Sequence, residues 1–398
     1  MSSNSNNRTN DSATNGWRAI VASILLAKTA VATFAIAPFL IGGYIDYLHL
    51  SVVQASRTLS VEIFALAISN ACAFFWIHKV SCRLWVRRIL LLLIALNISC
   101  VFVPDHETLL LLRALVGFAE GALLALGLGL LGTTARPNRN FGLYFAISLS
   151  VGAINIRILP LFLESAGVTG LFVNLSLYAV IALIGSAWVQ RHSIGETSVP
   201  ASNVVPSKGF AIAVLPLLFL MLANYVYFIG QGGVWSFLER LGVQHDIDLV
   251  GIANALAISL FAGVAGGATA GWLDLKLGRV IPMLLAIGLA IASIGLLFVS
   301  PTIVTFTIAA CLFNYGNNMG HPYVLGFAAK IDKSARLTVL SGALHTGGQA
   351  TGPIIAGLIV VTGDFSNVLW LGLSAFVLTI MLLVPVAFSI RSTDRSHP

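Results

Sequence analysis

The sequence predicts an all-α integral membrane protein with twelve transmembrane helices. First, 58% of its 398 residues are hydrophobic and only 9% are charged, with a mean hydropathy of +0.93, whereas soluble domains carry about 25% charged residues. Second, the chain contains long apolar runs separated by polar connections, and about 20 apolar residues are enough to cross a bilayer. Third, Lys and Arg collect in alternate connections, which is typical of multi-pass membrane proteins.

The first half of the chain contains six predicted spans. Residues 1–16 are rich in Ser and Asn, so we expect a disordered cytoplasmic tail. The apolar run that starts at Trp17 is too long for the core of a signal peptide, and it therefore predicts a retained first span. The six predicted spans cover residues 17–40, 57–77, 86–103, 109–132, 140–163 and 169–190.

A polar connection divides the predicted spans into two groups of six. Residues 191–209 are rich in Ser, Val and Pro, a composition that predicts a linker on the cytoplasmic side. We therefore expect two six-helix bundles, residues 17–190 and 210–390, and a cytoplasmic tail at 391–398. The spans predicted for the second bundle cover residues 210–232, 249–272, 280–299, 302–328, 336–361 and 366–390.

The distribution of charge predicts the orientation. If the N-terminus is cytoplasmic, most of the 22 Lys and Arg residues fall in inner connections, whereas the outer connections are mainly acidic. Both termini are then cytoplasmic. This explanation of the net charge of +7 makes nucleic acid an improbable partner. We expect a monomer that spans the plasma membrane, the inner membrane of a bacterium, with the lipid bilayer around it.

Several kinds of chemistry are not expected. Cys72, Cys82, Cys100 and Cys311 form no paired motif, so we predict no disulfide framework and no metal site. The chain has no Gly-rich phosphate loop, which excludes ATP as the expected energy source. It also has no HExxH or GxSxG pattern. We therefore expect no cofactor and no enzymatic activity.

Twelve spans in two halves resemble the major facilitator superfamily of secondary transporters, over residues 17–390. The loop after span eight, GWLDLKLGR at 271–279, is similar to the superfamily's G-x-L-a-D-r-x-G-R loop, with its Asp one position early. Arg113 and Gly117 in span four resemble the R-x-x-q-G signature. The resemblance implies two pseudo-symmetric bundles that rock about a midplane site, and a gating or packing role for the loop residues Gly271, Asp274, Gly278 and Arg279.

A third pattern lies in span eleven. Gly348, Gly352 and Pro353 are similar to the g-x-x-x-G-P-x-x-G-G pattern that proton antiporters carry in span five. Span eleven is the counterpart of span five in the other half, so the match favours internal duplication rather than an antiporter. We assign these three residues to close helix packing and gating, since small residues let helices approach closely.

The resemblance implies that spans one, four, seven and ten line a central cavity, and these spans are unusually polar. Asn and Tyr side chains can form hydrogen bonds with a ligand and stack against it, so they suit a polar or aromatic molecule. The predicted substrate-binding residues are Lys28, Arg113, Asn224, Tyr225, Tyr227, Gln231, Asn314, Tyr315, Asn317, Asn318 and His321.

Five charged residues lie within spans, where a charge persists only beside a partner or a wet cavity. Lys28 and Glu120 fall near the midplane, and we predict that they pair. Glu62, Arg113 and Arg157 fall in the outer half, and we predict that they form a cluster. Three cations against two carboxylates favour an anionic substrate. Glu120, Glu62 and Arg157 are the predicted proton-coupling residues, although static helix-to-helix bonds are an equally weighted interpretation.

The predicted function is therefore secondary active transport of a small organic solute. An organic anion with an aromatic or amphipathic part is favoured, moved together with protons, and His321 is a second candidate for proton handling. Two alternatives remain open. Glu120 could recognise an organic cation in a proton-driven drug efflux pump, or the chain could be a polytopic receptor or scaffold that transports nothing.

Overall fold

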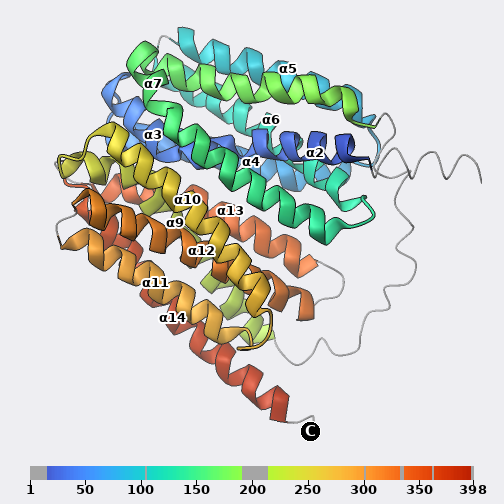
Figure 1. Ribbon diagram of the computed structural model, residues 1–398, viewed down its shortest axis with the longest axis vertical. Coiled ribbons are helices and arrows are strands. Elements are labelled where there is room, and N and C mark those ends of the chain that lie inside the picture. The colour runs from blue at the N-terminus through green and yellow to red at the C-terminus, as the bar shows by residue number, and fades with distance from the viewer. Residues whose placement is uncertain are drawn as a thin grey trace, which may run out of the picture. The chain divides into compact units, whose positions relative to one another are not determined.

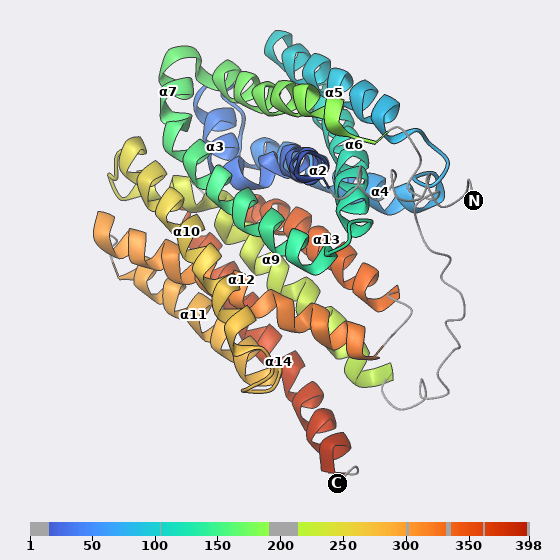
Figure 2. The same ribbon diagram turned by 45° about the vertical axis from the view of Figure 1, so that its right-hand side comes forward.

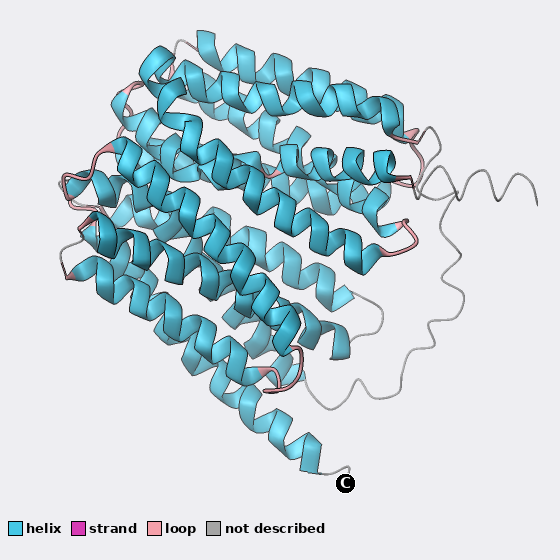
Figure 3. Cartoon of the chain, viewed as in Figure 1, coloured by secondary structure: helices cyan, strands magenta, loops and turns pink. Residues whose placement is uncertain are grey.

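The computed structural model describes residues 16–103, 105–190, 214–299, 302–331, 336–360 and 363–395. Helices and short 3-10 turns account for nearly all of these residues, and no strand occurs among them (Figure 3). The predicted linker, residues 191–209, and most of the predicted N-terminal tail lie outside the described residues. The helices are α2 Trp17–Ala30, α3 Ala32–Asp46, α4 Val52–Cys72, α5 Cys82–Ser99, α6 His106–Gly132, α7 Pro137–Gly185, α9 Val214–Gln244, α10 Leu249–Leu273, α11 Val280–Phe298, α12 Ile303–Ile331, α13 Arg336–Ile359 and α14 Ser366–Arg395.

Length and composition make this a membrane protein. Within the described residues, nine helical segments are long and apolar enough to cross a bilayer. Many large apolar side chains on these helices are exposed, for example Phe118 of α6 and Met381 of α14, as expected for surfaces that face lipid. The predicted all-α membrane fold is therefore confirmed at this level.

The first predicted span is longer than expected and is broken. Helix α2 ends at Ala30, and α3 begins at Ala32 and runs to Asp46. Between them, Val31 has φ −112° and ψ 13°, and its N–H donates a hydrogen bond to the carbonyl of Lys28. The break places Lys28 in the last turn of α2 and Thr33 in the first turn of α3.

Helix α7 combines two predicted spans. It has 49 residues, which at 1.5 Å each is about 74 Å and more than twice the thickness of a bilayer core. Its interior contains Gly167 with φ +56°, a backbone conformation that favours glycine. A Cβ atom there would also lie only 2.7 Å from Cδ1 of Tyr47. Figure 2 shows the two legs of α7 meeting at a bend.

The described residues form two compact units. The first unit draws on residues within 16–48, 61–152 and 161–190, and the second on residues within 49–60, 153–160 and 214–395. In the first unit α6 packs against α2 and α5, and its core contains the buried side chains Leu26, Val86 and Leu123. In the second unit α9 packs against α13 and α14, and α12 packs against α10 and α11 (labelled in Figure 1).

The residues predicted to act in gating lie at two places in the second unit. At the end of α10, Asp274 and Gly278 both have positive φ, 44° and 69°, so the chain turns sharply before Arg279 precedes α11. Gly271 lies in the last turn of α10 in open space. The span-eleven group, Gly348, Gly352 and Pro353, lies within α13.

Helix α13 packs tightly against α9 at two of those glycines. A Cβ atom on Gly348 would lie 2.6 Å from the carbonyl oxygen of Tyr225, and one on Gly352 would collide with the backbone of Gly233. Both positions therefore require glycine for the two helices to remain in contact, which is the physical role of small residues in membrane bundles.

Candidate functional site

A fully buried ion pair lies within the first unit. Glu62 of α4 and Arg113 of α6 are both 0% exposed. Arg113 Nε donates to Glu62 Oε2 at 2.8 Å, and its Nη2 donates to Glu62 Oε1. Arg113 Nη1 donates to Asn97 Oδ1 of α5 at 2.8 Å. Because this two-pronged geometry and the extra amide satisfy the guanidinium, the pair can persist away from water.

Two glycines of α6 let α4 approach closely enough to form this pair. Gly117 follows Arg113 by four residues and therefore lies on the same face of the helix. A Cβ atom on Gly117 would collide with the carbonyl oxygen of Glu62, and one on Gly121 would collide with that of Leu66. The spacing of Arg113, Gly117 and Gly121 in the sequence thus creates the contact surface that holds Glu62.

The Thr33 hydroxyl connects Glu62 to a second buried carboxyl. Thr33 Oγ1 lies 2.9 Å from Glu62 Oε1 and 3.0 Å from Glu120 Oε1. A hydroxyl has one hydrogen to donate and two lone pairs that accept. Both contacts are therefore hydrogen bonds only if one of the two carboxyls carries a proton and donates it to Thr33. The arrangement provides a place for one dissociable proton.

Glu120 is the less well satisfied of the two carboxyls. It is 3% exposed, and its Oε2 is buried with no hydrogen-bond partner within the part of the chain that the structure describes. Glu62, by contrast, is bonded to Arg113 through both of its oxygens. A buried charge without a partner costs several kcal/mol, so the proton at Thr33 is held most favourably on Glu120.

The predicted Lys28–Glu120 ion pair is wrong for this conformation. Lys28 is 4% exposed, and its Nζ lies 5.6 Å from the centroid of the Tyr178 ring. No ion pair joins it to a carboxylate among the described residues. Shared depth alone does not bring two side chains together, because each must also point toward the other about its helix axis. Lys28 is therefore a buried ammonium supported by a cation–π contact.

Only two of the three residues in the predicted cluster of Glu62, Arg113 and Arg157 lie together. Glu62 and Arg113 are paired, but the Arg157 side chain on α7 is exposed and makes no ion pair among the described residues. The Glu62 carboxylate accepts hydrogen bonds from Arg113 and is in contact with the Thr33 hydroxyl, and Arg157 is not among its partners.

In the second unit, most predicted substrate-binding residues form hydrogen bonds between helices. Asn224 Nδ2 donates to the carbonyl of Ser341 at 2.9 Å, and Asn314 Nδ2 donates to Ser259 Oγ at 2.9 Å. Two further bonds between helices join Tyr225 to Thr351 and Tyr315 to Thr269, whereas Asn318 donates within α12 to the carbonyl of Asn314. Asn317 Oδ1 is buried without a partner among the described residues.

Two histidines in the second unit lie together. The imidazole of His345 stacks on Phe228 at 3.8 Å between ring centroids, and His321 meets His345 edge to face at 4.5 Å. Gln349 Nε2 lies 3.2 Å from His345 Nε2 and donates to Gln231 Oε1 at 3.0 Å. The predicted residues Gln231 and His321 therefore belong to one polar and aromatic group.

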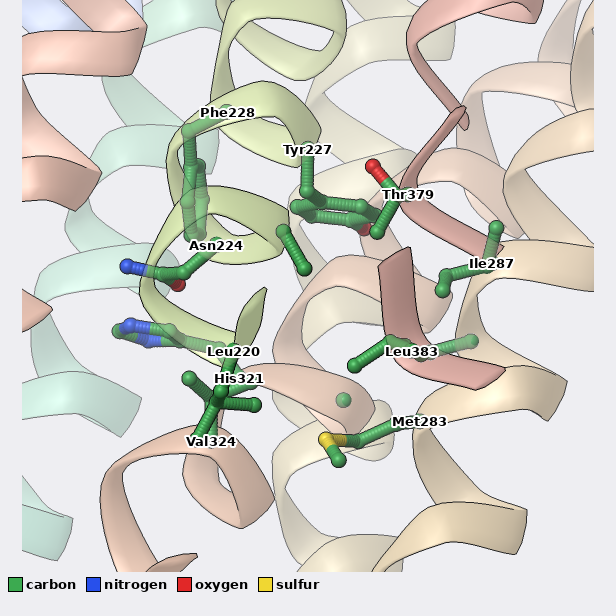
Figure 4. Close-up of a pocket in the computed structure, with 13 residues that line it drawn as sticks. Leu220, Asn224, Tyr227, Phe228, Met283, Ile287, His321, Val324, Thr379 and Leu383 are labelled. Atoms are coloured by element: carbon green, nitrogen blue, oxygen red, sulfur yellow. The ribbon is translucent and has the colours of Figure 1, made fainter. Parts of the chain in front are cut away.

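A small cavity lies beside this group, between α9, α11, α12 and α14 (Figure 4). Its volume is about 30 Å³. The predicted residues Asn224, Tyr227 and His321 line it, and the rest of its wall is almost entirely apolar. The other lining residues are Leu220, Ala223, Phe228, Met283, Ala286, Ile287, Gly320, Val324, Thr379 and Leu383.

Three residues of the first unit were missed as site residues by sequence reasoning. Thr33 and Asn97 complete the hydrogen bonds around the carboxyl pair, and Tyr178 provides the ring beside Lys28. Asn97 gave a signal, because an amide in the middle of an apolar run needs a buried partner. Thr33 and Tyr178 gave none, since Thr and Tyr are common in membrane helices and only the three-dimensional contact reveals their role.

Known proteins identify the fold. A comparison with curated proteins found no match. Among solved structures, a variant of the nucleoside transporter NupG matches with a TM-score of 0.74 and 11% identity, covering 92% of this chain and 98% of that chain. A POT family transporter in complex with 5-aminolevulinic acid matches with a TM-score of 0.73 and 14% identity, covering 94% and 98%. At such identities the likeness concerns the fold alone.

The family follows from the sequence. The family model described as Major Facilitator Superfamily matches residues 22–335, most of the chain. The matched region includes the carboxyl pair, Lys28 and the cavity-lining residues of α9 and α12. The chain belongs to the Major Facilitator Superfamily of membrane transporters.

Proposed function

We propose that this protein is a proton-coupled symporter for a small organic anion, working by alternating access as a monomer in a bacterial inner membrane. The observation that carries the proposal is the Thr33 hydroxyl between the carboxyls of Glu62 and Glu120. The rest of the proposal rests on the topology, on the net charge of the buried side chains in the first unit and on the residues that can contact a substrate.

The proposed topology has twelve spans with both termini in the cytoplasm. Helices α2 and α3 together form the first span, and the two legs of α7 on either side of Gly167 form two spans. The other helices contribute one span each. This topology is supported by the concentration of Lys and Arg on the proposed cytoplasmic side.

Glu120 is the proposed proton carrier. The two hydrogen bonds at the Thr33 hydroxyl require that one of the two carboxyls be protonated. Glu62 is paired with Arg113, whereas Glu120 has no such cation beside it. In the proposed cycle Glu120 is protonated in the conformation described here. Glu120 loses the proton when a rearrangement exposes it to water on the other side of the membrane. Water can solvate the ionised carboxylate, whereas the buried site cannot.

The charge balance favours an anion. With Glu120 neutral and Glu62 paired to Arg113, the buried charges of the first unit sum to that of Lys28 alone. Its ammonium has a ring beside it but no carboxylate among the described residues. An anionic group of a substrate would complete this site, and Tyr178 would lie against an apolar or aromatic part of the same molecule.

Substrate and proton would then support each other's binding. A negative substrate at Lys28 disfavours a second negative charge on Glu120 in the same unit. The anion is therefore bound best when Glu120 carries its proton, so the substrate and the proton are carried together. Such mutual support between the binding of the two cargoes is the physical basis of symport.

One observation favours a different cargo. The Oε2 atom of Glu120 is buried without a partner among the described residues, so an organic cation could complete it instead. In that case the protein would expel cations in exchange for protons, and Lys28 would repel the substrate rather than bind it.

The test starts with a thermal-shift screen of organic anions and cations on purified protein. Compounds that stabilise it are then measured for counterflow in proteoliposomes, and for accumulation driven by an inward proton gradient. Anion accumulation that collapses with the gradient supports the proposal. Cation expulsion would establish efflux, and stabilising ligands that never cross the membrane would indicate a receptor.

A further inference from the structure

One end of the first unit carries cations without acids. Its described residues are 16–20, 73–88, 132–140 and 185–190, and the 3-10 turn Ser186–Trp188 contacts both α2 and α5 there. None of these residues is Asp or Glu. Their exposed cations are Arg18, Lys79, Arg87, Arg88, Arg136 and Arg139. Because like charges repel each other, this surface is complementary to a partner with negative charge.

Arg87 of α5 is held in place by the 3-10 turn. Its Nε donates to Ser186 Oγ at 3.2 Å, and Ser186 Oγ donates its own hydrogen to the carbonyl of Leu183 at 2.6 Å. The hydroxyl therefore serves Arg87 only as an acceptor. The two Nη groups of Arg87 have no hydrogen-bond partner among the described residues, and the side chain is exposed. These groups form a fork of donors that suits the oxygens of a phosphate.

Apolar stripes on two helices begin beside Arg87. On α5, Arg88 shares an exposed helical face with Leu84 and Leu91. The last leg of α7 exposes a second stripe, formed by Val173, Leu177, Val180, Ile181 and Ile184. Figures 1 and 2 show this leg beside α5. In a bilayer such surfaces face acyl chains, so an amphiphile can lie along them with its headgroup at the two arginines.

Exposed tryptophans mark the depth of these arginines. Trp85, in the first turn of α5, is 40% exposed, and its ring lies 5.9 Å from that of Trp76 between centroids. Trp188, in the 3-10 turn, is also 40% exposed, and its ring lies 5.9 Å from that of Trp17. Trp is enriched where a membrane protein meets the lipid headgroups, because its ring is apolar and its N–H is polar. Arg87 therefore lies at the level of the lipid phosphates.

We propose that Arg87 and Arg88 bind the phosphate of an acidic phospholipid, whose acyl chains lie along α5 and the last leg of α7. A headgroup with net negative charge is selected, because a zwitterionic headgroup brings a cation that the surrounding cations repel. The acyl chains distinguish this ligand from a soluble phosphate, which gains nothing from the two apolar stripes. Neither arginine takes part in the proposed transport cycle, so the lipid site is independent of it.

Native mass spectrometry of the intact protein, released from a neutral detergent, resolves bound lipids one by one. Dioleoyl phosphatidylglycerol should bind more tightly than dioleoyl phosphatidylcholine, which has the same chains, by at least roughly fivefold in Kd. An excess of glycerol phosphate, which has the charge without the chains, should leave the bound phosphatidylglycerol in place. Equal affinity for the two lipids would overturn the proposal. Displacement by glycerol phosphate would also overturn it, because the site would then take a soluble phosphate.

Three variants test whether the arginine is held for this purpose. Arg87→Gln should raise Kd for phosphatidylglycerol at least roughly fivefold and leave phosphatidylcholine unchanged. Ser186→Ala keeps every charge but removes the acceptor that holds Arg87, so it should raise the same Kd. The control is Arg136→Gln, which removes one exposed charge at the same end, before α7. An unchanged Kd in Arg87→Gln, or an equal rise in Arg136→Gln, would show only diffuse attraction and would contradict a lipid site.

Discussion

The Thr33 hydroxyl of α3 and the Glu120 carboxyl of α6 lie 3.0 Å apart, and the same hydroxyl lies 2.9 Å from Glu62. One hydrogen cannot serve two carboxylates, so the contact between Thr33 and Glu120 implies a proton on one of the acids. Arg113 pairs with Glu62 on its other side, which leaves Glu120 as the acid without an ion-pair partner among the described residues.

Breaking the Glu62–Arg113 pair should destabilise the first unit. Glu62→Gln leaves the Arg113 guanidinium buried without a compensating charge, and such losses are typically about 3–5 kcal/mol in the free energy of unfolding. Chemical denaturation in detergent measures the change. The control is Glu107→Gln, because the Glu107 side chain is 73% exposed and should contribute less than about 1 kcal/mol. Similar losses in the two variants would contradict the account.

Removing both partners of the pair gives a sharper measurement. Glu62→Leu combined with Arg113→Met replaces two charges with apolar side chains, and such exchanges of buried pairs are often neutral for stability. We expect the double variant to be more stable than Glu62→Gln but to lose transport. Recovery of neither stability nor fold would show that the pair has an additional structural role.

Enlarging Gly117 should separate α6 from α4. The Cβ atom of Gly117→Ala would collide with the carbonyl oxygen of Glu62, and overpacking of this kind typically costs about 1–3 kcal/mol. Gly132→Ala is the matched control on the same helix, since nothing lies within 4 Å of that position. Thermal unfolding should distinguish the two variants, and equal melting temperatures would exclude a close contact at Gly117.

Lys28 should determine affinity for an anion. Lys28→Met removes the ammonium but keeps an unbranched chain beside Tyr178, so Kd for a transported anion should rise. Loss of a charge-assisted hydrogen bond is worth about 1.5–3 kcal/mol, or roughly 10- to 150-fold in Kd. The control is Lys276→Met, which removes a cation that lies over Trp272 in the loop after α10. An unchanged Kd for Lys28→Met would exclude the proposed anion site.

The cap of α6 should make stability depend on pH. Asp105 precedes the helix and accepts hydrogen bonds from the N–H and hydroxyl of Thr108, and these bonds lower the pKa of its carboxyl in the folded state. A lowered folded pKa means that the ionised cap stabilises the protein above the ordinary Asp pKa of about 3.9, and that this contribution is lost as the pH falls through the folded value.

Asp105→Asn isolates that contribution, because Asn can still cap a helix but cannot ionise. The variant should be less stable than the natural protein at neutral pH, and the difference should shrink in acid. Denaturation curves at both conditions measure it. A difference that is the same at neutral and acid pH would mean that the charge of Asp105 plays no part.

The sequence predicts the membrane class well and the local irregularities poorly. Hydropathy and charge asymmetry identify apolar helices because lipid imposes the same requirement on every span. The break at Val31 carries no Gly or Pro signal, and it was therefore missed. The bend at Gly167 lies between two correctly expected apolar runs, but sequence alone does not show that the helix continues through both sides of it.

Depth proved a partial guide to the site. Glu62 and Arg113 lie at similar depth and form a pair as expected, with Gly117 allowing the close approach. Lys28 and Glu120 were placed at one depth as well, but Lys28 lies beside the Tyr178 ring and does not pair with Glu120. Two side chains pair only if they lie at the same depth and also point toward each other about their helix axes. A hydropathy pattern gives the depth but not the direction.

The most direct test of the central claim is transport by Glu120→Gln. Glutamine resembles the protonated carboxyl in shape and can donate to Thr33, but it cannot release a proton. The variant should bind the anion and exchange it across proteoliposomes as the natural protein does, yet it should not accumulate the anion when an inward proton gradient is applied. Gradient-driven accumulation at the natural rate by Glu120→Gln would contradict the assignment of Glu120 as the proton carrier.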